Sequence, residues 1–513
     1  MGLLRYTASA DNTIVNAYKL DLQTRATGSN AGLADIVETY STFGRINSSS
    51  QELSRILMKF PTTQIAADRS AGNIPASGSV SFYLRLFNAP HSRTVPVQYK
   101  LTVAAVSQSW EEGVGLDLEG YTDKTNSQSG SDWIQAKKGS NWTDYKGNAS
   151  PGGLYSTASG EVFSQFFSSG LEDIELDISE LVERWLGATS TLAGNYGVGI
   201  MFSSSYEASA SQEAVDLDSN VIYNPNGETT SNYTKRFFAR GTQYFFKRPV
   251  IEARWDSTIK DQRSQFFFSS SRAPAADNLN TVYLYNVIRG RLVDIPDINQ
   301  GDTILVSLYS GSADNSSPSG SELKLYNAHY SITGGHAGET GIYSCSLGIV
   351  SSAVSPLYDV WHKGGKQYFT GSITPMVFDQ GMTSQNPTYY INISNMKNYY
   401  CRQDTSRFNL YVREKDWKPN SYVIANGTYP SLSIRSASYG VVRLIDNTFV
   451  IPYGTGSDQH TALSHDVSGN YFNFDMSLLE PGYAYGFKFV FYDDIIGSYI
   501  EQDDIFKFWL EEK

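Results

Sequence analysis

Apolar and polar residues alternate with a period of two along many short segments of this chain. In "SVSFYLRLF" (79–87), Val80, Phe82, Leu84 and Leu86 occupy every second position. Successive side chains of a β-strand point to opposite faces of a sheet, so this pattern predicts a strand with one buried face. The same alternation predicts strands at "YKLTVAAV" (99–106), "TILVSLYS" (303–310), "RFNLYVRE" (407–414) and "YGFKFVFY" (485–492). The chain is therefore expected to be all-β.

Two segments depart from this alternation. "LSRILMKF" (53–60) is mostly apolar without a clear period, and we interpret it as a buried strand rather than a helix. "DISELVERWLG" (177–187) predicts the one convincing helix, with Asp177 as N-cap, Glu180 completing a capping box and Gly187 as the stop.

A chain of 513 residues is too long for a single core. The strand at 245–256 is followed by a linker-like stretch at 269–278, and a second break lies near 384–392. Short strands separated by turn-rich gaps are typical of β-sandwiches. We therefore predict a large β-sandwich at 1–257 and two smaller immunoglobulin-like β-sandwiches at 258–385 and 386–513.

The charge balance and the cysteines restrict the function classes. A net charge of −12 argues against a nucleic-acid binder, which normally shows a basic face. Cys345 and Cys401 are too few for a disulfide framework, and we expect two buried thiols. No stretch reaches the ~18 apolar residues of a membrane span, and no secretion signal is predicted at the N-terminus. The chain is thus expected to be made in a cytoplasm.

One short segment, "SQSWEEGVGLDLEGYTD" (107–123), gathers five carboxylates beside Trp110. A glycosidase needs two carboxyl groups about 5–9.5 Å apart. Glu111 and Glu112 would point to opposite faces of a strand, so they do not form this pair together. Glu111 with Asp117 is the alternative pair, but Gly113 and Gly115 between them predict a flexible loop, so catalysis is disfavoured.

The same loop offers hard oxygen ligands of the kind that Ca²⁺ prefers. Glu111, Asp117 and Glu119 are the candidate Ca²⁺ ligands, and no other cofactor is expected. A plain acidic loop without bound metal is the alternative that we favour. No catalytic residue is predicted, so the chain is expected not to be an enzyme.

Other motifs give weaker indications. In "NWTDYKG" (141–147), Trp142 and Tyr145 are candidates for stacking on a glycan, or for contacting a neighbouring subunit. His465 beside Asp466 lacks a nucleophile motif, and "GGHAGETG" (334–341) lacks the Lys-Ser/Thr ending of a phosphate-binding loop, so an ordinary hairpin or loop is expected there.

"DMSLLEPGYAYGFKF" (475–489) predicts a turn before a strand. Tyr483 and Tyr485 are two positions apart, and one of them is expected to form a tyrosine-corner contact.

Five motifs occur in a fixed order along the first half of the chain. They are "SRILMKFPTTQI" (54–65), "SVSFYLRLFNA" (79–89), "LTVAAVSQSWEEGVG" (101–115), "LEDIELDISELVERWLG" (171–187) and "NYGVGIMF" (195–202). This order resembles the DNRLRE-type jelly-roll sandwiches, which are related to carbohydrate-binding modules. The resemblance implies that 1–257 is a jelly-roll-like sandwich with one short helix and that Trp110 packs inward. The stretches 121–165 and 203–235 look like added loops.

Longer runs of the chain resemble virion structural proteins of tailed marine phages, including cyanobacterial ones. These runs are "SQELSRILMKFP", "SVSFYLRLFNAPHS", "SQSWEEGVGLDLEGYTD", "KRPVIEARWDS", "APAADNLNTVYLYN" and "DMSLLEPGYAYGFKF". The resemblance implies a non-enzymatic part of a virion, in the tail, neck or baseplate. Expected partners are other virion proteins and copies of the chain itself in a homo-oligomer. A carbohydrate-binding adhesin that contacts host glycans is the alternative.

Overall fold

The computed structural model describes residues 2–91, 95–116, 118, 130–187, 195–210, 222–270, 272–274, 276–298, 301–311, 319–326, 328–350, 355–376, 388–427, 429, 431–493 and 496–512. These residues form two compact units. The N-terminal unit comprises Gly2–Asp256 and Ser457–His460, and the C-terminal unit comprises Ser257–Gly456 and Thr461–Lys513. Division of the chain into three domains stays a prediction. No helix within the described ranges combines the length and apolarity needed to cross a bilayer.

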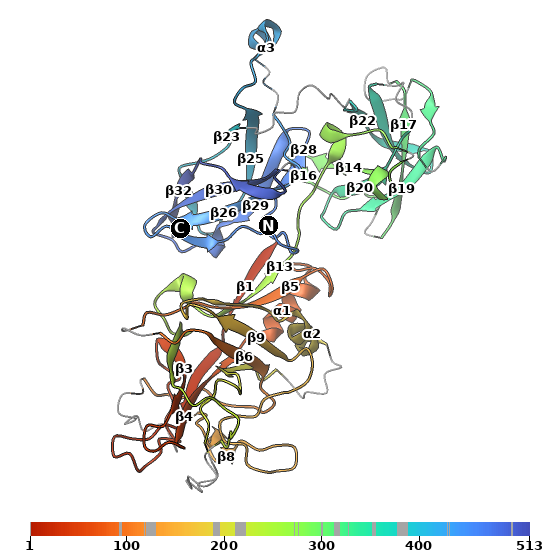
Figure 1. Ribbon diagram of the computed structural model, residues 1–513. Coiled ribbons are helices and arrows are strands. Elements are labelled where there is room, and N and C mark those ends of the chain that lie inside the picture. The colour runs from red at the N-terminus through yellow and green to blue at the C-terminus, as the bar shows by residue number, and fades with distance from the viewer. Residues whose placement is uncertain are drawn as a thin grey trace. The chain divides into compact units, whose positions relative to one another are not determined.

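Two antiparallel sheets build the N-terminal unit (Figure 1). The four-stranded sheet has the order β1 (Leu3–Thr7), β13 (Val250–Arg254), β5 (Ser81–Leu86), β10 (Ile174–Asp177). The larger sheet has the order β12 (Asn232–Phe238), β3 (Ile36–Phe43), β4 (Gln51–Lys59), β11 (Val198–Phe202), β6 (Tyr99–Ala105), β9 (Val162–Phe167), and β2 (Ala10–Val15) also pairs with β4. A small hairpin joins β7 (Gln135–Lys137) to β8 (Ser140–Asn141).

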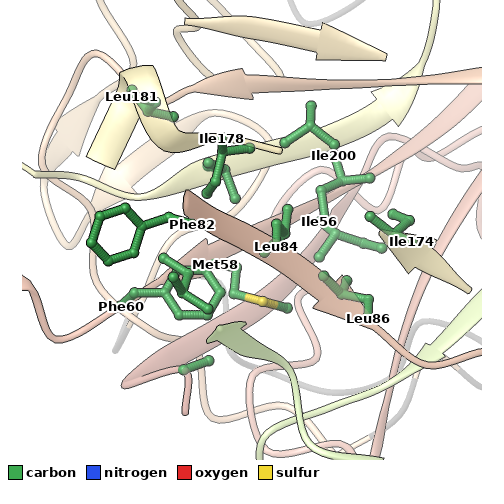
Figure 2. Packing of buried hydrophobic residues seen from close by; sticks show 14 of the residues in the cluster. Ile56, Met58, Phe60, Phe82, Leu84, Leu86, Ile174, Ile178, Leu181 and Ile200 are labelled. Carbon is green, nitrogen blue, oxygen red and sulfur yellow. The ribbon is translucent and has the colours of Figure 1, made fainter. Parts of the chain in front are cut away.

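The core of this unit lies between the two sheets (Figure 2). Phe82, Leu84 and Leu86 of β5 are fully buried in it, as their alternation predicts. Ile56 and Met58 of β4 face the same core from the opposite sheet. The all-β sandwich class is therefore confirmed.

Strand β4 is buried on both faces. Ile56 and Met58 face the core between the sheets, whereas Leu53 and Leu57 face a second apolar cluster on the other side of the large sheet. A strand covered on both faces reads as a nearly continuous apolar run. This explains "LSRILMKF" and confirms its interpretation as a buried strand.

Helix α2 (Ser179–Leu186) confirms the predicted helix, but its start differs. Asp177 is the last residue of β10, and its carboxylate accepts hydrogen bonds from the Ser179 amide and hydroxyl at 2.9 and 2.5 Å. The expected capping box is wrong, because Glu180 instead pairs with Arg184 at 2.5 Å. The helix ends at Leu186, so Gly187 is placed as predicted.

A second helix, α1 (Thr62–Ser70), was not predicted. It follows Pro61 and buries only Ile65 completely, so its sequence carries a weak apolar stripe. Arg69 of α1 binds Glu183 of α2 through two hydrogen bonds of 2.6 and 2.8 Å. The two helices thus lie side by side against the core (Figure 1).

The C-terminal unit holds three larger sheets. One has the order β14 (Asn280–Tyr285), β20 (Ile342–Leu347), β19 (Ser331–His336), β17 (Thr303–Tyr309), β21 (Leu357–Lys363), β22 (Lys366–Ile373), with β18 (Glu322–Leu323) on β17. The second has the order β23 (Tyr389–Ile393), β25 (Thr405–Glu414), β29 (Gly469–Asp475), β28 (Ser464–Asp466). The third has the order β24 (Tyr399–Cys401), β32 (Phe506–Glu511), β30 (Ala484–Asp493), β26 (Ala437–Arg443), β27 (Thr448–Ile451), with β31 (Ser498–Glu501) on β30.

Smaller elements complete this unit. They are the hairpin of β15 (Val287–Ile288) and β16 (Arg291–Leu292), helix α3 (Ser421–Asn426), and the 3-10 turns η3 (Gln262–Gln265), η4 (Ala276–Asn278) and η5 (Met476–Leu478). The 3-10 turn η2 (Phe245–Lys247) belongs to the N-terminal unit. Both cysteines are free thiols. Cys345 is buried as expected, but Cys401 is only partly buried.

Aromatic rings fill the sandwich between the second and third sheets. Phe487 of β30 lies 4.9 Å from Phe408 of β25 and 5.1 Å from Phe472 of β29, centroid to centroid. Tyr439 of β26 stacks on Phe472 at 4.3 Å. Large rings at every second position of facing strands bury much apolar surface, so the sequence alternation directly builds this core.

The tyrosine corner is confirmed at the start of β30. The hydroxyl of the fully buried Tyr485 donates a hydrogen bond of 2.6 Å to the carbonyl oxygen of Glu480. Gly482 in the intervening turn has a φ of +85°, which favours glycine. This contact fixes the turn against the strand.

Candidate functional site

The first part of the acidic loop is a packed structural segment. Trp110 is 1% exposed, and its indole N–H donates a hydrogen bond of 2.7 Å to the Tyr196 carbonyl. The Lys59 ammonium donates to the Trp110 carbonyl and lies 4.4 Å from the centre of its ring. The inward packing of Trp110 is confirmed, and no face of this ring is left for a ligand.

The glycines of this loop serve close packing rather than flexibility. A Cβ atom on Gly113 would lie 2.0 Å from Asn30 Oδ1, and one on Gly115 would lie 1.9 Å from the Asn30 carbonyl oxygen. The Gly115 amide donates to Asn30 Oδ1 at 3.2 Å, and the Leu33 amide donates to the Gly115 carbonyl at 2.9 Å. The expectation of a flexible segment is wrong here, because two backbones meet with no room for side chains.

Glu112 is occupied by structural partners. Its Oε1 accepts hydrogen bonds from the Asp11 amide at 2.8 Å and from Arg240 Nε at 2.7 Å, and its Oε2 accepts one from Arg240 Nη2 at 2.5 Å. A bidentate arginine fixes a carboxylate in one geometry. Glu112 therefore ties the loop to β2 and to the segment after β12.

The neighbouring Asp11 has the perturbed chemistry that often marks an active site. Burial raises the pKa of its carboxyl group to about 7, and the nearby Glu112 charge acts in the same direction. Asp11 is only 1% exposed, however, and its Oδ2 accepts a hydrogen bond of 2.6 Å from the Arg240 amide. A group this deeply buried has no route to a substrate, so its pKa reflects burial.

Of the three predicted Ca²⁺ ligands, Glu111 is the one within the described residues. Glu111 is exposed, and its backbone is held by hydrogen bonds to Ala136 and Ser131 at 3.0 and 2.7 Å. Asp117 and Glu119 lie outside the described residues, so the Ca²⁺ site stays a prediction. In the part of the chain that the structure describes, no three His, Cys, Asp or Glu side chains group closely enough to hold a metal ion.

The predicted glycan pair separates into one buried and one exposed ring. Trp142 is 0% exposed, and its indole N–H donates a hydrogen bond of 2.8 Å to the Asp132 carbonyl. Tyr145 is 90% exposed. The expectation that Trp142 presents its ring to a ligand is wrong, because the indole packs with Trp110 and Trp133 over the large sheet.

A buried arginine missed by the sequence analysis organises this tryptophan cluster. Arg55 of β4 pairs with Glu207 at 2.7 Å and donates to the Gly152 carbonyl at 3.2 Å. Its guanidinium lies 5.5 Å from the ring centres of both Trp133 and Tyr155. In the sequence, the one sign of this buried ion pair was a lone arginine inside an apolar strand, because the partners of Arg55 come from loops that are distant in sequence.

The histidine and glycine motifs have structural roles. His465 of β28 is 2% exposed, and burial lowers the pKa of its imidazole to about 4. His336 ends β19, which pairs with β20 as the expected hairpin, and its Nε2 lies 3.1 Å from Asp294 Oδ1.

Exposed aromatic rings lie on the outer surface of the third sheet, two at its β24–β32 edge and one at its β27 edge. We call Tyr399, Trp509 and Phe449 the outer aromatic face; they are 62%, 42% and 40% exposed. Tyr399 and Trp509 are direct neighbours in the parallel pairing of β24 with β32. Phe449 lies over Gly440 of β26, 3.0 Å from where a Cβ atom would be. In β32, Phe508 and Leu510 face the core, so Trp509 between them points outward. A tryptophan at a position where the alternation calls for a polar residue is the sequence signal for this exposed ring.

No family model and no curated protein matches this chain. A crystal structure of Salmonella alpha-2-macroglobulin reacted with methylamine is similar over 99% of this chain and 34% of that chain, with 9% identity and a TM-score of 0.15. A mutant of the same Salmonella protein gives 8% identity, the same coverage and a TM-score of 0.15. This chain thus spans about a third of the length of those proteins, and such weak likeness assigns neither fold nor function.

Proposed function

We propose that this chain is a non-enzymatic structural component of a tailed-phage virion. It serves as an appendage or adaptor of the tail, neck or baseplate and assembles through its β-sandwich domains. The assignment to a virion rests on the resemblance of several sequence segments to virion structural proteins of tailed marine phages. Other virion proteins and copies of the chain are the partners.

The observation that carries the assembly role is the outer aromatic face. Tyr399, Trp509 and Phe449 stand on an open sheet surface whose inner side is already filled by other rings. Tyrosine, tryptophan and phenylalanine are enriched at protein interfaces, where their large apolar areas become buried. The carboxylates of Glu112 and Asp11 are occupied by structural hydrogen bonds, which fits a structural role for this part of the loop.

Immunogold electron microscopy of purified particles tests this proposal, with antibody raised against residues 258–513. Gold at one fixed place on the particle is the expected result. Detergent-opened particles are labelled in parallel, so that a covered epitope is distinguished from an absent protein. Label in the lysate but on neither particle preparation would refute the virion role.

A glycan-binding adhesin is the second candidate, and the pairing of Tyr399 with Trp509 favours it. Their strands lie about 4.8 Å apart, and both side chains are exposed, so sugar rings can reach two neighbouring aromatic rings. Calorimetric titration with bacterial surface polysaccharide tests it. The Trp509→Ala variant should lose binding, whereas Tyr145→Ala, which removes a lone exposed ring, should keep it. Equal binding by both variants would exclude this surface.

A further inference from the structure

Lys235 of β12 is a lysine enclosed in the core of the N-terminal unit. It is 0% exposed, whereas lysine is almost never fully buried unless it is paired. Its Nζ lies 5.1 Å and 4.7 Å from the ring centres of Phe167 and Phe237. Burial lowers the pKa of the Lys235 amine to about 8. About a tenth of these amines are therefore neutral at pH 7, and a neutral, desolvated amine is a nucleophile.

The Lys235 amine faces the side-chain amide of Asn88, which follows β5. Nζ donates a hydrogen bond of 2.6 Å to Asn88 Oδ1. A C=O bond is about 1.23 Å long, so Asn88 Cγ lies within about 3.8 Å of Nζ. Reacting atoms about 3–3.5 Å apart define a near-attack geometry. The Ala89 amide donates a hydrogen bond of 3.1 Å to the Arg236 carbonyl, so the two backbones hold the amine and the amide together.

His91 and Asp173 complete a cluster around this pair. His91 Nε2 lies 2.9 Å from Asn88 Oδ1, and burial lowers the pKa of its imidazole, so the ring is neutral near pH 7. In the tautomer that carries a proton on Nε2, it donates to Oδ1 and stabilises negative charge on that oxygen. Asp173 Oδ1 accepts a hydrogen bond of 2.7 Å from the Asn88 backbone amide, and its charge acts on the Lys235 amine. This carboxylate is therefore placed to move a proton between the two side-chain nitrogens.

A closely packed turn holds the amine against the amide. Lys235 Nζ also donates to the carbonyl oxygens of Gly170 and Glu172, at 2.9 and 2.8 Å. Gly170 has a φ of +79°, and a Cβ atom there would lie 2.0 Å from the Pro96 carbonyl oxygen. Glu172 Oε1 accepts a hydrogen bond of 2.7 Å from the Ser169 amide, which closes the turn. Three acceptors also suit an ammonium group, so a hydrogen-bonded pair without a covalent bond is the alternative that the experiment must exclude.

We propose that Lys235 and Asn88 are joined by an isopeptide bond that the folded chain forms by itself. Lys235 Nζ attacks Asn88 Cγ, with His91 donating to the oxygen of the tetrahedral intermediate. The bond from Cγ to Nδ2 then breaks, and Asp173 carries one proton from Nζ to the leaving nitrogen. The products are a secondary amide and one ammonia molecule, and no atom changes its oxidation state.

The bond would join the two sheets of the N-terminal sandwich. β12 is an edge strand of the larger sheet, and Asn88 follows a strand of the four-stranded sheet. The two residues are 147 positions apart in the chain. A cross-link that closes a long loop stabilises a fold because it restricts the unfolded chain. This inference goes beyond the proposed virion role and does not depend on it, so either can fail alone.

Mass spectrometry of the full chain, denatured after purification, tests the proposal. The wild-type chain should be lighter than its sequence mass by one ammonia, and a tryptic digest should contain a branched peptide that joins Asn88 to Lys235. Lys235→Arg should have the full sequence mass. The matched control Lys100→Arg, at an exposed position of β6, should lose ammonia like wild type. Circular dichroism verifies that each variant is folded.

The rate of bond formation gives a second readout, measured on chain that is isolated unfolded and then refolded. Asp173→Asn keeps both reacting groups and removes the carboxylate, so the ammonia loss should slow at least about tenfold. The wild-type rate should rise as the pH rises toward about 8, because the neutral fraction of the Lys235 amine rises.

Two outcomes would overturn the proposal. One is a folded wild-type chain that keeps its full sequence mass after incubation at about pH 9, where most of the Lys235 amine is neutral; Lys235 and Asn88 would then form a hydrogen-bonded pair only. The other is ammonia loss that persists in folded Lys235→Arg. If Lys235→Arg does not fold, the fragment masses of the wild-type branched peptide still decide, because they locate the bond. An Asp173→Asn variant that reacts as fast as wild type would overturn the proton transfer assigned to this carboxylate.

Discussion

Replacing Trp142 by alanine distinguishes a structural tryptophan from a ligand-binding one. The ring is 0% exposed and packs against Trp110 and Trp133 above β4. Removing a buried tryptophan side chain typically costs about 3–5 kcal/mol, since it leaves a cavity. The Asp132 carbonyl also loses the indole donor at 2.8 Å, which adds about 1 kcal/mol or more. We therefore expect the N-terminal unit to lose about 4–6 kcal/mol of unfolding free energy.

Urea denaturation followed by tryptophan fluorescence measures this loss. At a slope of about 3 kcal/mol per molar urea, the midpoint of the N-terminal unit should fall by more than about 1 M. The matched control is Tyr145→Ala, three residues away and 90% exposed, which should stay within about 0.5 kcal/mol of wild type. If Trp142→Ala lowers the unfolding free energy by less than about 1 kcal/mol, or by no more than Tyr145→Ala does, the buried position of the Trp142 ring is contradicted.

Three further perturbations test other parts of the fold. Gly113→Ala should destabilise the N-terminal unit by about 1–3 kcal/mol in urea, because its Cβ would lie 2.0 Å from Asn30 Oδ1. Gly241→Ala should be nearly neutral, because its Cβ would come no closer than 3.8 Å to another atom. Tyr485→Phe should cost about 1 kcal/mol in thermal denaturation, because the Glu480 carbonyl loses its donor; an unchanged melting temperature would contradict the tyrosine corner. Burial raises the pKa of the Asp11 carboxyl group in the folded state to about 7, above its ordinary value of 3.8, so between these two pH values only the folded state holds the proton. Stability should therefore fall as pH rises from about 4 to about 7, and Asp11→Asn should flatten this part of the pH profile; an identical profile would refute the assignment.

Two ligands are proposed for the outer aromatic face of the last sandwich, a partner protein and a glycan. Titration with the Trp509→Ala variant distinguishes them, because only the glycan alternative predicts a loss of polysaccharide binding.

The strands were predictable from sequence because their pattern is local. Alternation over six to ten residues reflects the pleat itself, so β5, β6, β17, β25 and β30 follow from it directly. The nearly continuous apolar run of β4 likewise indicated a buried strand. The tyrosine corner was also predictable, since Tyr485 and Glu480 are only five residues apart.

The candidate sites depended on contacts that no local pattern contains. Trp142 looked like an exposed loop residue, and only the folding of its loop onto the large sheet buries it among other tryptophans. Glu112 meets Arg240, 128 residues away, and Gly113 meets Asn30 across a gap that fits no Cβ atom. Composition and periodicity thus determined an acidic, all-β chain. Tertiary packing alone decided which carboxylates and aromatic rings are buried or paired inside the fold and which remain exposed on its surface. The physical reason is that the burial of a side chain depends on segments that are distant in sequence.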